Sequence, residues 1–407
     1  MRALVAFLRF LLRVQGLVVE GGEVLQEEDA VVIRGRRRSH AQPRCPFHRR
    51  ERLTGTITRR KLRWRHLDLM GVRTFIECEV REGRCRRCDG RRTERVSWAA
   101  IRAQHTRAFD RRVASLVQVA DKSATARMFQ VCWMTVGRIV ERVVAECLPR
   151  DLLDDLVAIA VDETSHKRGH RYLTVVTDIE RNRVVWVGEG KGADTLRQFF
   201  AVLGPERAAK LKLVAMDMSG AYASVVKELA KDADIVFDRF HVVKLLLEAI
   251  DEVRRQEVRK LDGEARFALK RTRFALLRNP RHINDRDREA IARVMATNRR
   301  LTRAYQLRVD FEQLWDCATE EKAEEFVAKW TRAAMRSRLN PLKRFARTVR
   351  DHLEGILMFF RYPGQTSGMA EGMNNKIKLL IHKAYGFHNV AALIAMVYLC
   401  CTGIRLP

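Results

Sequence analysis

The sequence lacks any run of about 18 uncharged apolar residues, the length that a membrane-spanning helix requires. Its apolar first stretch contains Arg9 and Arg13, and no small-residue cleavage site follows, so we do not expect a signal peptide there. The nine cysteines are too few and too scattered for a disulfide scaffold. We therefore expect a cytoplasmic protein with reduced thiols and no contact with a membrane.

Acidic residues are in the minority. The chain carries 78 Lys and Arg against 50 Asp and Glu, which gives a formal net charge of +28. A charge this far from zero attracts polyanions, so nucleic acid is the expected partner. The alternatives are a basic protein with solvated charged faces and a ribosome-associated protein. Internal repeats and low-complexity tracts are also absent, and the length allows about two to three domains.

The basic residues are concentrated near the N-terminus. Residues 34–66 hold thirteen Lys and Arg and a single acid, Glu51. We expect this stripe, including Arg36, Arg37 and Arg38, to contact DNA phosphates.

Two pairs of metal-binding side chains lie in or just after this stripe. Cys45 and His48 form one pair, Cys85 and Cys88 form the other, and two residues separate the members of each. A structural zinc site needs four N or S ligands, which two tight turns can supply. The pattern predicts one structural Zn²⁺ in a zinc ribbon or knuckle. Free thiols are the alternative, and Cys78 is the substitute ligand if His48 does not bind.

Residues 105–145 are predicted to be helical, in three amphipathic pieces at 109–119, 123–129 and 133–145. The short break before the third piece is typical of a helix-turn-helix. The third helix would then enter the major groove of DNA and present early residues such as Thr135 and Arg138. The alternative is a three-helix spacer between domains.

After Pro149 the pattern changes to short apolar runs that end in acids or turns. Predicted strands occupy 156–162, 172–178, 183–188, 212–217 and 234–238, with helices at 193–204 and 220–231. From about 242 to 350 the chain is charged and helical, and further helices follow at 369–384 and 391–401. This order is that of the ribonuclease H-like fold, so we expect an α/β core of that class with an all-α insertion at about 246–350.

In that fold, carboxylates from the first strand, the fourth strand and a C-terminal helix converge, and here those positions hold Asp162, Asp217 and Glu371. Converging carboxylates repel one another unless cations lie between them. Oxygen ligands without His or Cys suit Mg²⁺ or Mn²⁺. Two such ions about 3.5–4 Å apart can activate one oxygen and stabilise another in phosphodiester cleavage. The sequence therefore predicts a catalytic triad that holds two ions.

Other residues near these acids invite interpretation. Asn374 or Asn375, Lys378 and His382 follow Glu371 at helical spacing, so we expect them to share its face. Asn374, Lys378 and His382 are the expected DNA contacts. Glu163 should face away from Asp162, and Asp238 should lie near the site. Taken singly, each acid has an ordinary alternative, because Asp often ends a strand as a turn former or cap, and Glu often begins a helix.

Four stretches of the sequence resemble the ISL3 family of bacterial insertion-sequence transposases, which have a DDE catalytic domain. They are AVDETSHKRGHRYLTVVTD (160–178), VAMDMSGAY (214–222), FDRFHVVKL (237–245) and TSGMAEGMNNKIKLLIHKAYGF (366–387). The family's zinc finger usually begins Cys-Pro-x-Cys, whereas this chain has His48 at the second position. The resemblance implies binding of double-stranded DNA at terminal inverted repeats, cleavage at the ends, and joining of a 3′-OH to target DNA.

The resemblance also frames the domains and the assembly. We expect a zinc-finger module at 1–95, a helix-turn-helix at 96–150 and the catalytic domain at 151–407. Because two element ends must be held together, a homodimer on DNA is expected, with Trp315 and Trp330 as candidate interface residues or, alternatively, core residues. Two other functions compete: a catalytically silent regulator derived from a transposase, and a resolvase-like or repair nuclease.

Overall fold

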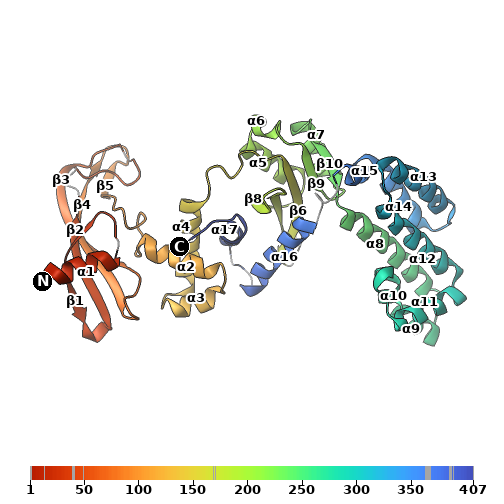
Figure 1. Ribbon diagram of the computed structural model, residues 1–407, viewed down its shortest axis with the longest axis horizontal. Coiled ribbons are helices and arrows are strands. Elements are labelled where there is room, and N and C mark those ends of the chain that lie inside the picture. The colour runs from red at the N-terminus through yellow and green to blue at the C-terminus, as the bar shows by residue number, and fades with distance from the viewer. Residues whose placement is uncertain are drawn as a thin grey trace. The chain divides into compact units, whose positions relative to one another are not determined.

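The computed structural model describes residues 2–12, 14–38, 42–48, 50–167, 169, 171–362, 368–384, 387 and 389–406. Side chains before residue 5 and at 368–371 are outside this description. The chain forms two compact units, Met1–Pro149 with Phe387–Pro407, and Arg150–Gly386 (Figure 1). Each unit is described by itself.

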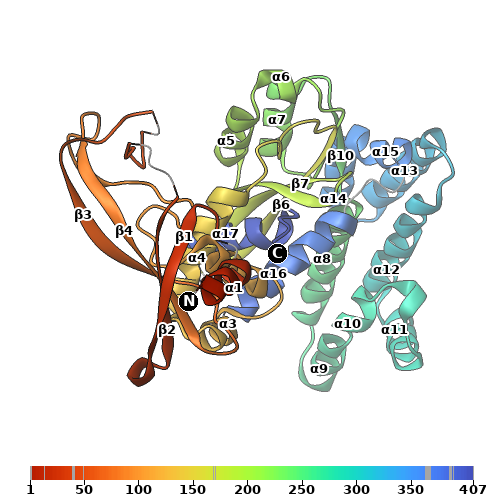
Figure 2. The same ribbon diagram turned by 60° about the vertical axis from the view of Figure 1, so that its left-hand side comes forward.

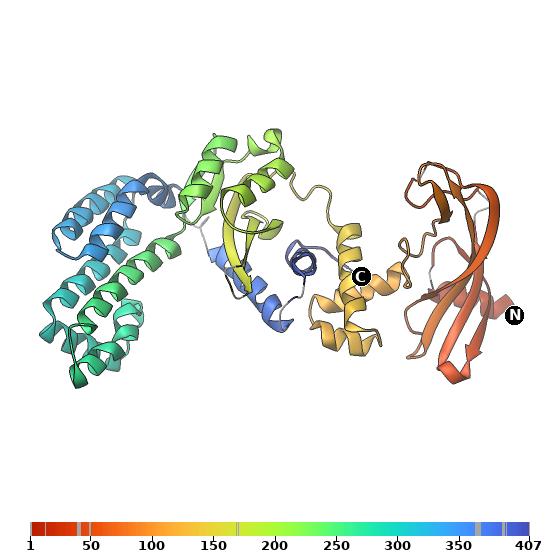
Figure 3. The same ribbon diagram turned by 180° about the vertical axis from the view of Figure 1, so that it is seen from behind.

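The N-terminal part of the first unit is a β-sheet with one helix, α1 (Arg2–Leu12). Its strands are β1 (Leu17–Leu25), β2 (Ala30–Arg37), β3 (Thr54–Arg65), β4 (Arg73–Cys85) and β5 (Gly90–Thr93). Their order is β1-β2-β4-β3, and β5 pairs with β4. Figure 3 shows this sheet from behind. Ile33, Ile76 and Val80 are fully buried, and Trp64 meets Trp98 edge-to-face at 5.7 Å. The N-terminal sheet therefore has a hydrophobic core of its own, apart from the candidate metal ligands.

Three helices follow in the first unit: α2 (Arg107–Val117), α3 (Lys122–Met128) and α4 (Trp133–Cys147). Thr106 and Asp121 cap α2 and α3 by accepting hydrogen bonds from backbone N–H groups, which is why these helices begin where they do. The buried residues of α4 recur at helical spacing on one side: Val136, Ile139, Val140, Val143 and Val144.

The C-terminal helix α17 (Val390–Cys401) also belongs to the first unit. The Gln118 side-chain amide donates hydrogen bonds of 2.9 Å to the carbonyl oxygens of Leu399 and Ile404. The sequence-based domain 151–407 therefore differs from the packing at its C-terminal end.

The second unit is built on a mixed five-stranded sheet. Its strands are β6 (Ala158–Lys167), β7 (Arg171–Asp178), β8 (Arg183–Glu189), β9 (Leu213–Met216) and β10 (Asp234–Phe237). The order is β10-β9-β6-β7-β8, with β6–β7–β8 antiparallel and β9 and β10 parallel to β6. The helices between strands are α5 (Ala193–Leu203), α6 (Pro205–Ala208) and α7 (Gly220–Leu229), whereas α16 (Gly368–Lys383) runs beside β6 (Figure 2).

A helical block follows β10 in the chain. Its helices are α8 (Arg239–Val258), α9 (Gly263–Arg271), α10 (Arg273–Leu277), α11 (Asp285–Thr297), α12 (Arg299–Glu312), α13 (Glu320–Arg336), α14 (Asn340–Asp351) and α15 (Leu353–Arg361). Two 3-10 turns also belong to it, η2 (Pro280–His282) and η3 (Gln313–Asp316), whereas η1 (Gln26–Glu28) lies in the first unit between β1 and β2. The block is wider than the predicted insertion, because α8 begins directly after β10.

Both tryptophans of this block are interior residues. Trp330 is 4% exposed, donates a hydrogen bond of 2.8 Å to the Leu307 carbonyl oxygen and packs edge-on against Phe311. Trp315 is 7% exposed. The interpretation of these two residues as interface anchors is therefore wrong, and the core alternative is confirmed.

Candidate functional site

Three aspartates lie at equivalent positions along three neighbouring parallel strands: Asp162 is part of β6, and Asp217 and Asp238 directly follow β9 and β10. Ala160 of β6 is paired in register with Ala215 of β9, and Ala215 is paired with Val236 of β10. Asp162, Asp217 and Asp238 each follow that row by two residues. Since side chains alternate along strands and neighbouring strands lie roughly 4.8 Å apart, the three carboxylates share one end of the sheet.

Burial and like charge act on the first of these acids. Burial raises the pKa of Asp162, and the Asp238 and Asp217 carboxylates raise it further. A hydrogen bond of 2.6 Å from the Glu163 N–H and the nearby His241 act in the opposite direction. The row thus concentrates negative charge in a half-buried place.

Helix α16 is bonded to this site through Asn374. The Asn374 side chain is 5% exposed, and its Nδ2 donates a hydrogen bond to Oδ2 of Asp162. Its Oδ1 accepts a hydrogen bond of 2.8 Å from the hydroxyl of Thr164, which is also buried. Glu371 lies one turn earlier in α16, and its side chain is outside the described part.

The buried position of Asn374 corrects one prediction. We expected Asn374 or Asn375 to share one face with Lys378 and His382, and Asn374 to contact DNA. Asn375, Lys378 and His382 are exposed, whereas Asn374 is buried. Both polar atoms of the Asn374 amide are hydrogen-bonded inside the protein, so its position does not support the prediction of Asn374 as a DNA contact.

Asp238 and His241 lie at the end of this row, after β10. Asp238 begins α8 by accepting a hydrogen bond of 2.7 Å from the Phe240 N–H, and its own N–H donates to the Met216 carbonyl oxygen at 2.9 Å. His241 Nε2 lies 3.9 Å from Asp238 Oδ2. The alignment of Asp238 with Asp217 follows from the register of β9 and β10. The sequence alone does not show which strands pair, so it could not give this register.

Glu163 lies on the other face of β6, as alternation along the strand requires. Its carboxylate accepts a hydrogen bond of 2.9 Å from the hydroxyl of Tyr222, a fully buried residue of α7. Tyr222 also meets the Thr174 hydroxyl at 3.0 Å. Glu163 therefore joins the sheet to α7.

The two cysteine-containing pairs meet in the first unit. The ligand atoms of Cys45, His48, Cys85 and Cys88 all lie within 4.8 Å of one another. His48 Nδ1 is 3.9, 3.8 and 3.3 Å from the sulfurs of Cys45, Cys85 and Cys88, and the Cys45 and Cys88 sulfurs are 3.6 Å apart. Zn–S bonds of about 2.3 Å and Zn–N bonds of about 2.0 Å imply tetrahedral ligand separations of about 3.5–3.8 Å. The four side chains form a candidate metal site of that size.

Cys78 is not part of this cluster. It is 2% exposed in the core of the sheet, and burial raises the pKa of its thiol to about 11. With Cys78 in the core, His48 is the fourth member of the cluster.

The predicted DNA-contacting arginines before the cluster are partly engaged within the protein. Arg36 pairs with Glu20 at 3.1 Å, and Arg37 pairs with Glu94, whose side chain is buried and also holds Arg81. Arg38 is exposed, and no ion pair is found for it within the described ranges. The structure thus separates Arg37, whose partner Glu94 is buried, from the exposed Arg36 and Arg38.

The residues predicted to read DNA lie at the start of α4. Arg138 is exposed, and the half-buried Thr135 has its hydroxyl 3.0 Å from the sulfur of Cys132, which precedes the helix. Deeper in the bundle, Arg142 of α4 forms a forked ion pair with the buried Asp110 of α2, with distances of 3.0–3.1 Å. This pair fixes α4 on α2 and leaves the start of α4 available to a partner.

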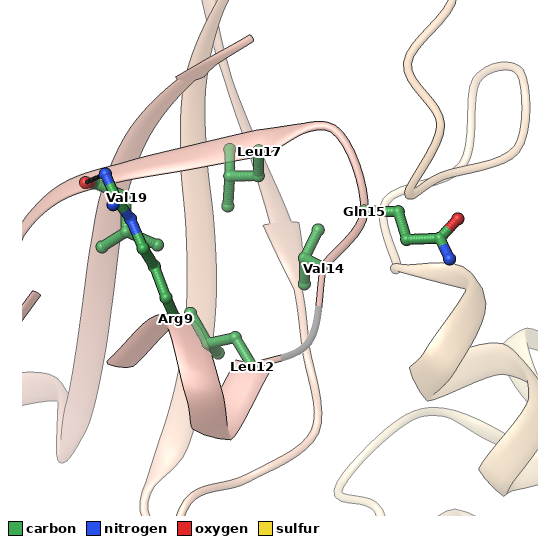
Figure 4. Close-up of a pocket in the computed structure, with 6 residues that line it drawn as sticks. All are labelled: Arg9, Leu12, Val14, Gln15, Leu17 and Val19. Atoms are coloured by element: carbon green, nitrogen blue, oxygen red, sulfur yellow. Dashed lines mark hydrogen bonds between the residues drawn. The ribbon is translucent and has the colours of Figure 1, made fainter. Parts of the chain in front are cut away.

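A cavity of about 320 Å³ lies beside α1 and β1 (Figure 4). Its described lining includes Leu12, Leu17 and Val19, and Arg9 there donates a hydrogen bond of 3.3 Å to the Val19 carbonyl oxygen. Among the lining residues that the structure describes, none is an acid, a histidine or a cysteine. These residues therefore offer no group for general acid–base catalysis or metal binding.

Comparisons with known proteins agree with this architecture. A family model described as "Transposase", of the ISL3 group, matches residues 159–397. A second model, "Helix-turn-helix domain of transposase family ISL3", matches residues 94–144.

Two relatives match most of the chain. The transposase for insertion sequence element IS1557 of Mycobacterium tuberculosis (strain CDC 1551 / Oshkosh) is 35% identical over 366 residues, which cover 84% of this chain and 82% of the relative. The transposase for insertion sequence element IS1001 of Bordetella parapertussis is 32% identical over 330 residues, which cover 80% of this chain and 81% of the relative.

These matches confirm the resemblance expected from the sequence motifs, and they span both the helix-turn-helix and the sheet that carries the aspartates. Within the part of the chain that the structure describes, no helix has the length and apolar character needed to cross a bilayer. The chain belongs to the ISL3 family of insertion-sequence transposases.

Proposed function

We propose that the protein binds the terminal inverted repeats of its own insertion sequence, cleaves at the ends and joins the 3′-OH to target DNA. The observation that carries this proposal is the alignment of Asp162 with Asp217 on adjacent parallel strands, with α16 bonded to Asp162 through Asn374. The strand order β10-β9-β6-β7-β8 supports a ribonuclease H-like core that begins after residue 150.

Asp162, Asp217 and Glu371 would hold two Mg²⁺ or Mn²⁺ ions. The donor set fits hard cations, because it consists of oxygen atoms, and the half-buried aspartate row needs positive charge. When bound, such ions activate the attacking oxygen and stabilise the leaving oxygen of a phosphodiester. Asn374 orients the Asp162 carboxylate, while the exposed Lys378 and His382 contact DNA phosphates.

The N-terminal modules would supply recognition of the element ends. The donor set of Cys45, His48, Cys85 and Cys88 fits one structural Zn²⁺, which would hold two turns of the finger module together. Thr135 and Arg138 at the start of α4 would contact base edges, and Arg36 and Arg38 would contact phosphates.

Cleavage of a labelled inverted-repeat end in the presence of Mg²⁺ tests the catalytic part. Asp217→Asn preserves the shape of the side chain and removes a charged ligand, so we expect cleavage to fall below detection while end binding persists. Asp194→Asn is the matched control, since the Asp194 side chain is 99% exposed, and it should cleave as wild type does.

The same assay separates the competing functions. A wild-type protein that binds the ends but never cleaves them, with Asp217→Asn behaving identically, would make the protein a regulator. Cleavage that ignores the inverted-repeat sequence would make it a nuclease of another kind.

A further inference from the structure

A second cavity, of about 500 Å³, lies in the helical block where α13, α14 and the start of α15 meet. Helices α13 and α14 lie side by side (Figure 1). Arg332 and Arg336 of α13 and Arg347 and Arg350 of α14 line the cavity. The catalytic proposal assigns no role to this cavity.

The charge of this lining is not balanced from within. Arg332 and Arg336 are four residues apart and Arg347 and Arg350 are three apart, so each pair shares one face of its helix. Like charges at these spacings destabilise a helix. Glu324 is the one acid among the described residues of the lining.

Among the described residues, only Arg350 of the four arginines has an ion pair, with Asp351 at 3.9 Å. Two arginines of the adjoining helices outside the cavity have acidic partners: Arg344 of α14 pairs with Glu252, and Arg361 of α15 pairs with Glu320. The cavity thus gathers four arginines of which three have no acidic partner in the described part of the chain, and an anion from outside would balance their charge.

The rest of the lining is apolar except for Thr331, whose hydroxyl donates a hydrogen bond of 2.8 Å to the Val327 carbonyl oxygen. Val327 and Ala346 are each 2% exposed and form its deeper part, and Met335 is 36% exposed at its edge. A phosphate alone would gain nothing from such a surface, whereas the flat face of a nucleobase would be covered by it.

We propose that this cavity binds one unpaired nucleotide of a DNA strand, with its phosphate on the arginines and its base against Val327, Ala346 and Met335. Guanidinium groups pair with phosphate through two hydrogen bonds and also stack on base faces. The volume suits a ligand of nucleotide size. An intact duplex keeps its base faces stacked inside, so the ligand is a single strand or an unpaired end.

The cavity lies in the same compact unit as the aspartate row. Helix α15, which supplies Leu353 to the lining, packs closely on β10. A Cβ atom at Gly355 would lie 2.5 Å from the Phe237 ring, so only glycine permits this approach. Phe237 precedes Asp238, which connects the cavity wall to the carboxylate end of the sheet. This inference rests on the proposed function in taking DNA as the ligand.

The test uses the full-length protein and two fluorescein-labelled oligonucleotides of about eight residues. One is an oligothymidylate, and the other has the same phosphates but abasic sugars. Anisotropy is measured without divalent metal and without chelator, so that cleavage does not occur and the finger keeps its metal. We expect wild type to prefer the oligothymidylate by about 5- to 150-fold, the value of stacking one base.

Two variants test the cavity, one by removing its positive charge and the other by filling its volume. Arg332→Ala with Arg336→Ala and Arg347→Ala removes the charge, and its control, Arg259→Ala with Arg266→Ala and Arg286→Ala, removes equal charge from exposed arginines of the same block. Ala328→Trp fills the cavity from an exposed lining position and keeps every arginine. The cavity triple and Ala328→Trp should lose the preference for thymidylate, and the control should keep it.

An unchanged preference in both cavity variants would overturn the proposal. Equal loss of affinity for both oligonucleotides in the arginine variant, with Ala328→Trp behaving as wild type, would also overturn it, because the arginines would then bind phosphates alone. Asp217→Asn should keep the preference. The preference for oligothymidylate is measured without cleavage, so it can be tested even if the catalytic proposal is wrong. The nucleotide-binding proposal and the catalytic proposal can therefore fail separately.

Discussion

Asn374 occupies a position where two polar contacts depend on one side chain. Replacing it with Ala leaves the Thr164 hydroxyl and Asp162 without this partner, and removes the bond between α16 and β6. We expect Asn374→Ala to lower strand cleavage by about 10- to 100-fold, as loss of a residue that orients a metal ligand does. We also expect a decrease of about 1–3 kcal/mol in the free energy of unfolding.

Asn375 provides the control for this prediction, because it is adjacent and exposed. Asn375→Ala should leave unfolding unchanged. The Mg²⁺ concentration needed for half-maximal cleavage should rise in Asn374→Ala alone. If both variants need the same Mg²⁺ concentration for half-maximal cleavage, Asn374 contributes to packing and does not orient the Asp162 carboxylate.

A second residue makes the first unit sensitive to acid. His66 is 3% exposed and shares a hydrogen bond of 2.8 Å with Thr106. Burial lowers the pKa of His66 from 6.5 to about 4. Between these values the unfolded chain binds more protons than the folded one, so stability is lost as the pH falls through that window.

From pH 7 to pH 5, this one histidine should remove roughly 2 kcal/mol from the free energy of unfolding. His105, whose pKa burial also lowers to about 4, acts in the same direction, and Asp110, whose pKa burial raises to about 6, opposes it. Urea unfolding at both pH values should therefore show a smaller difference for His66→Gln than for wild type. The exposed His282→Gln should match wild type.

At the scale of elements, the two tight turns of the finger depend on each other through their four ligand atoms. We expect purified protein to contain about one zinc per chain. Cys85→Ser with Cys88→Ser should release the zinc and abolish specific end binding, because β4 and its following turn lose their connection to the turn at 45–48.

Cys317→Ser is the control for the zinc prediction, since Cys317 follows η3 in the helical block and lies outside the cluster. Elemental analysis of fresh protein provides the measurement. If fresh protein contains no zinc and still binds the ends specifically, the zinc prediction is wrong and residues 45–88 form a metal-free basic fold.

Some helices and strands, and their packing, could be predicted from the sequence, and others could not. The strands around Asp162 and Asp217 were predictable because short apolar runs are a local signal, but β6 continues five residues beyond the predicted end at 162. The packing of α17 with α4 was not, because it depends on contacts between segments far apart in the chain. The buried side of α16 was not either, since a polar Asn374 inside the protein becomes visible only once Thr164 and Asp162 are located.

At the scale of the whole molecule, the net charge of +28 sets the conditions for assembly. Self-repulsion should keep the free protein monomeric until DNA neutralises it. Trp315 and Trp330 are buried, so they offer a partner nothing, whereas Phe267 and Phe274 are 62% and 72% exposed. Aromatic side chains are favoured at interfaces, so these two residues are the better candidates for contact between copies.

The prediction is a homodimer that forms on DNA, because joining requires both element ends in one complex. Light scattering of the protein with a two-ended substrate should give two protomers per pair of ends at saturation, and the protein alone should give a monomer. Phe267→Ser with Phe274→Ser should weaken pairing without changing binding to a single end, since neither residue belongs to the modules that read DNA. One protomer per pair of ends in the wild type would refute the dimer, and unchanged pairing in the variant would assign the interface to another surface.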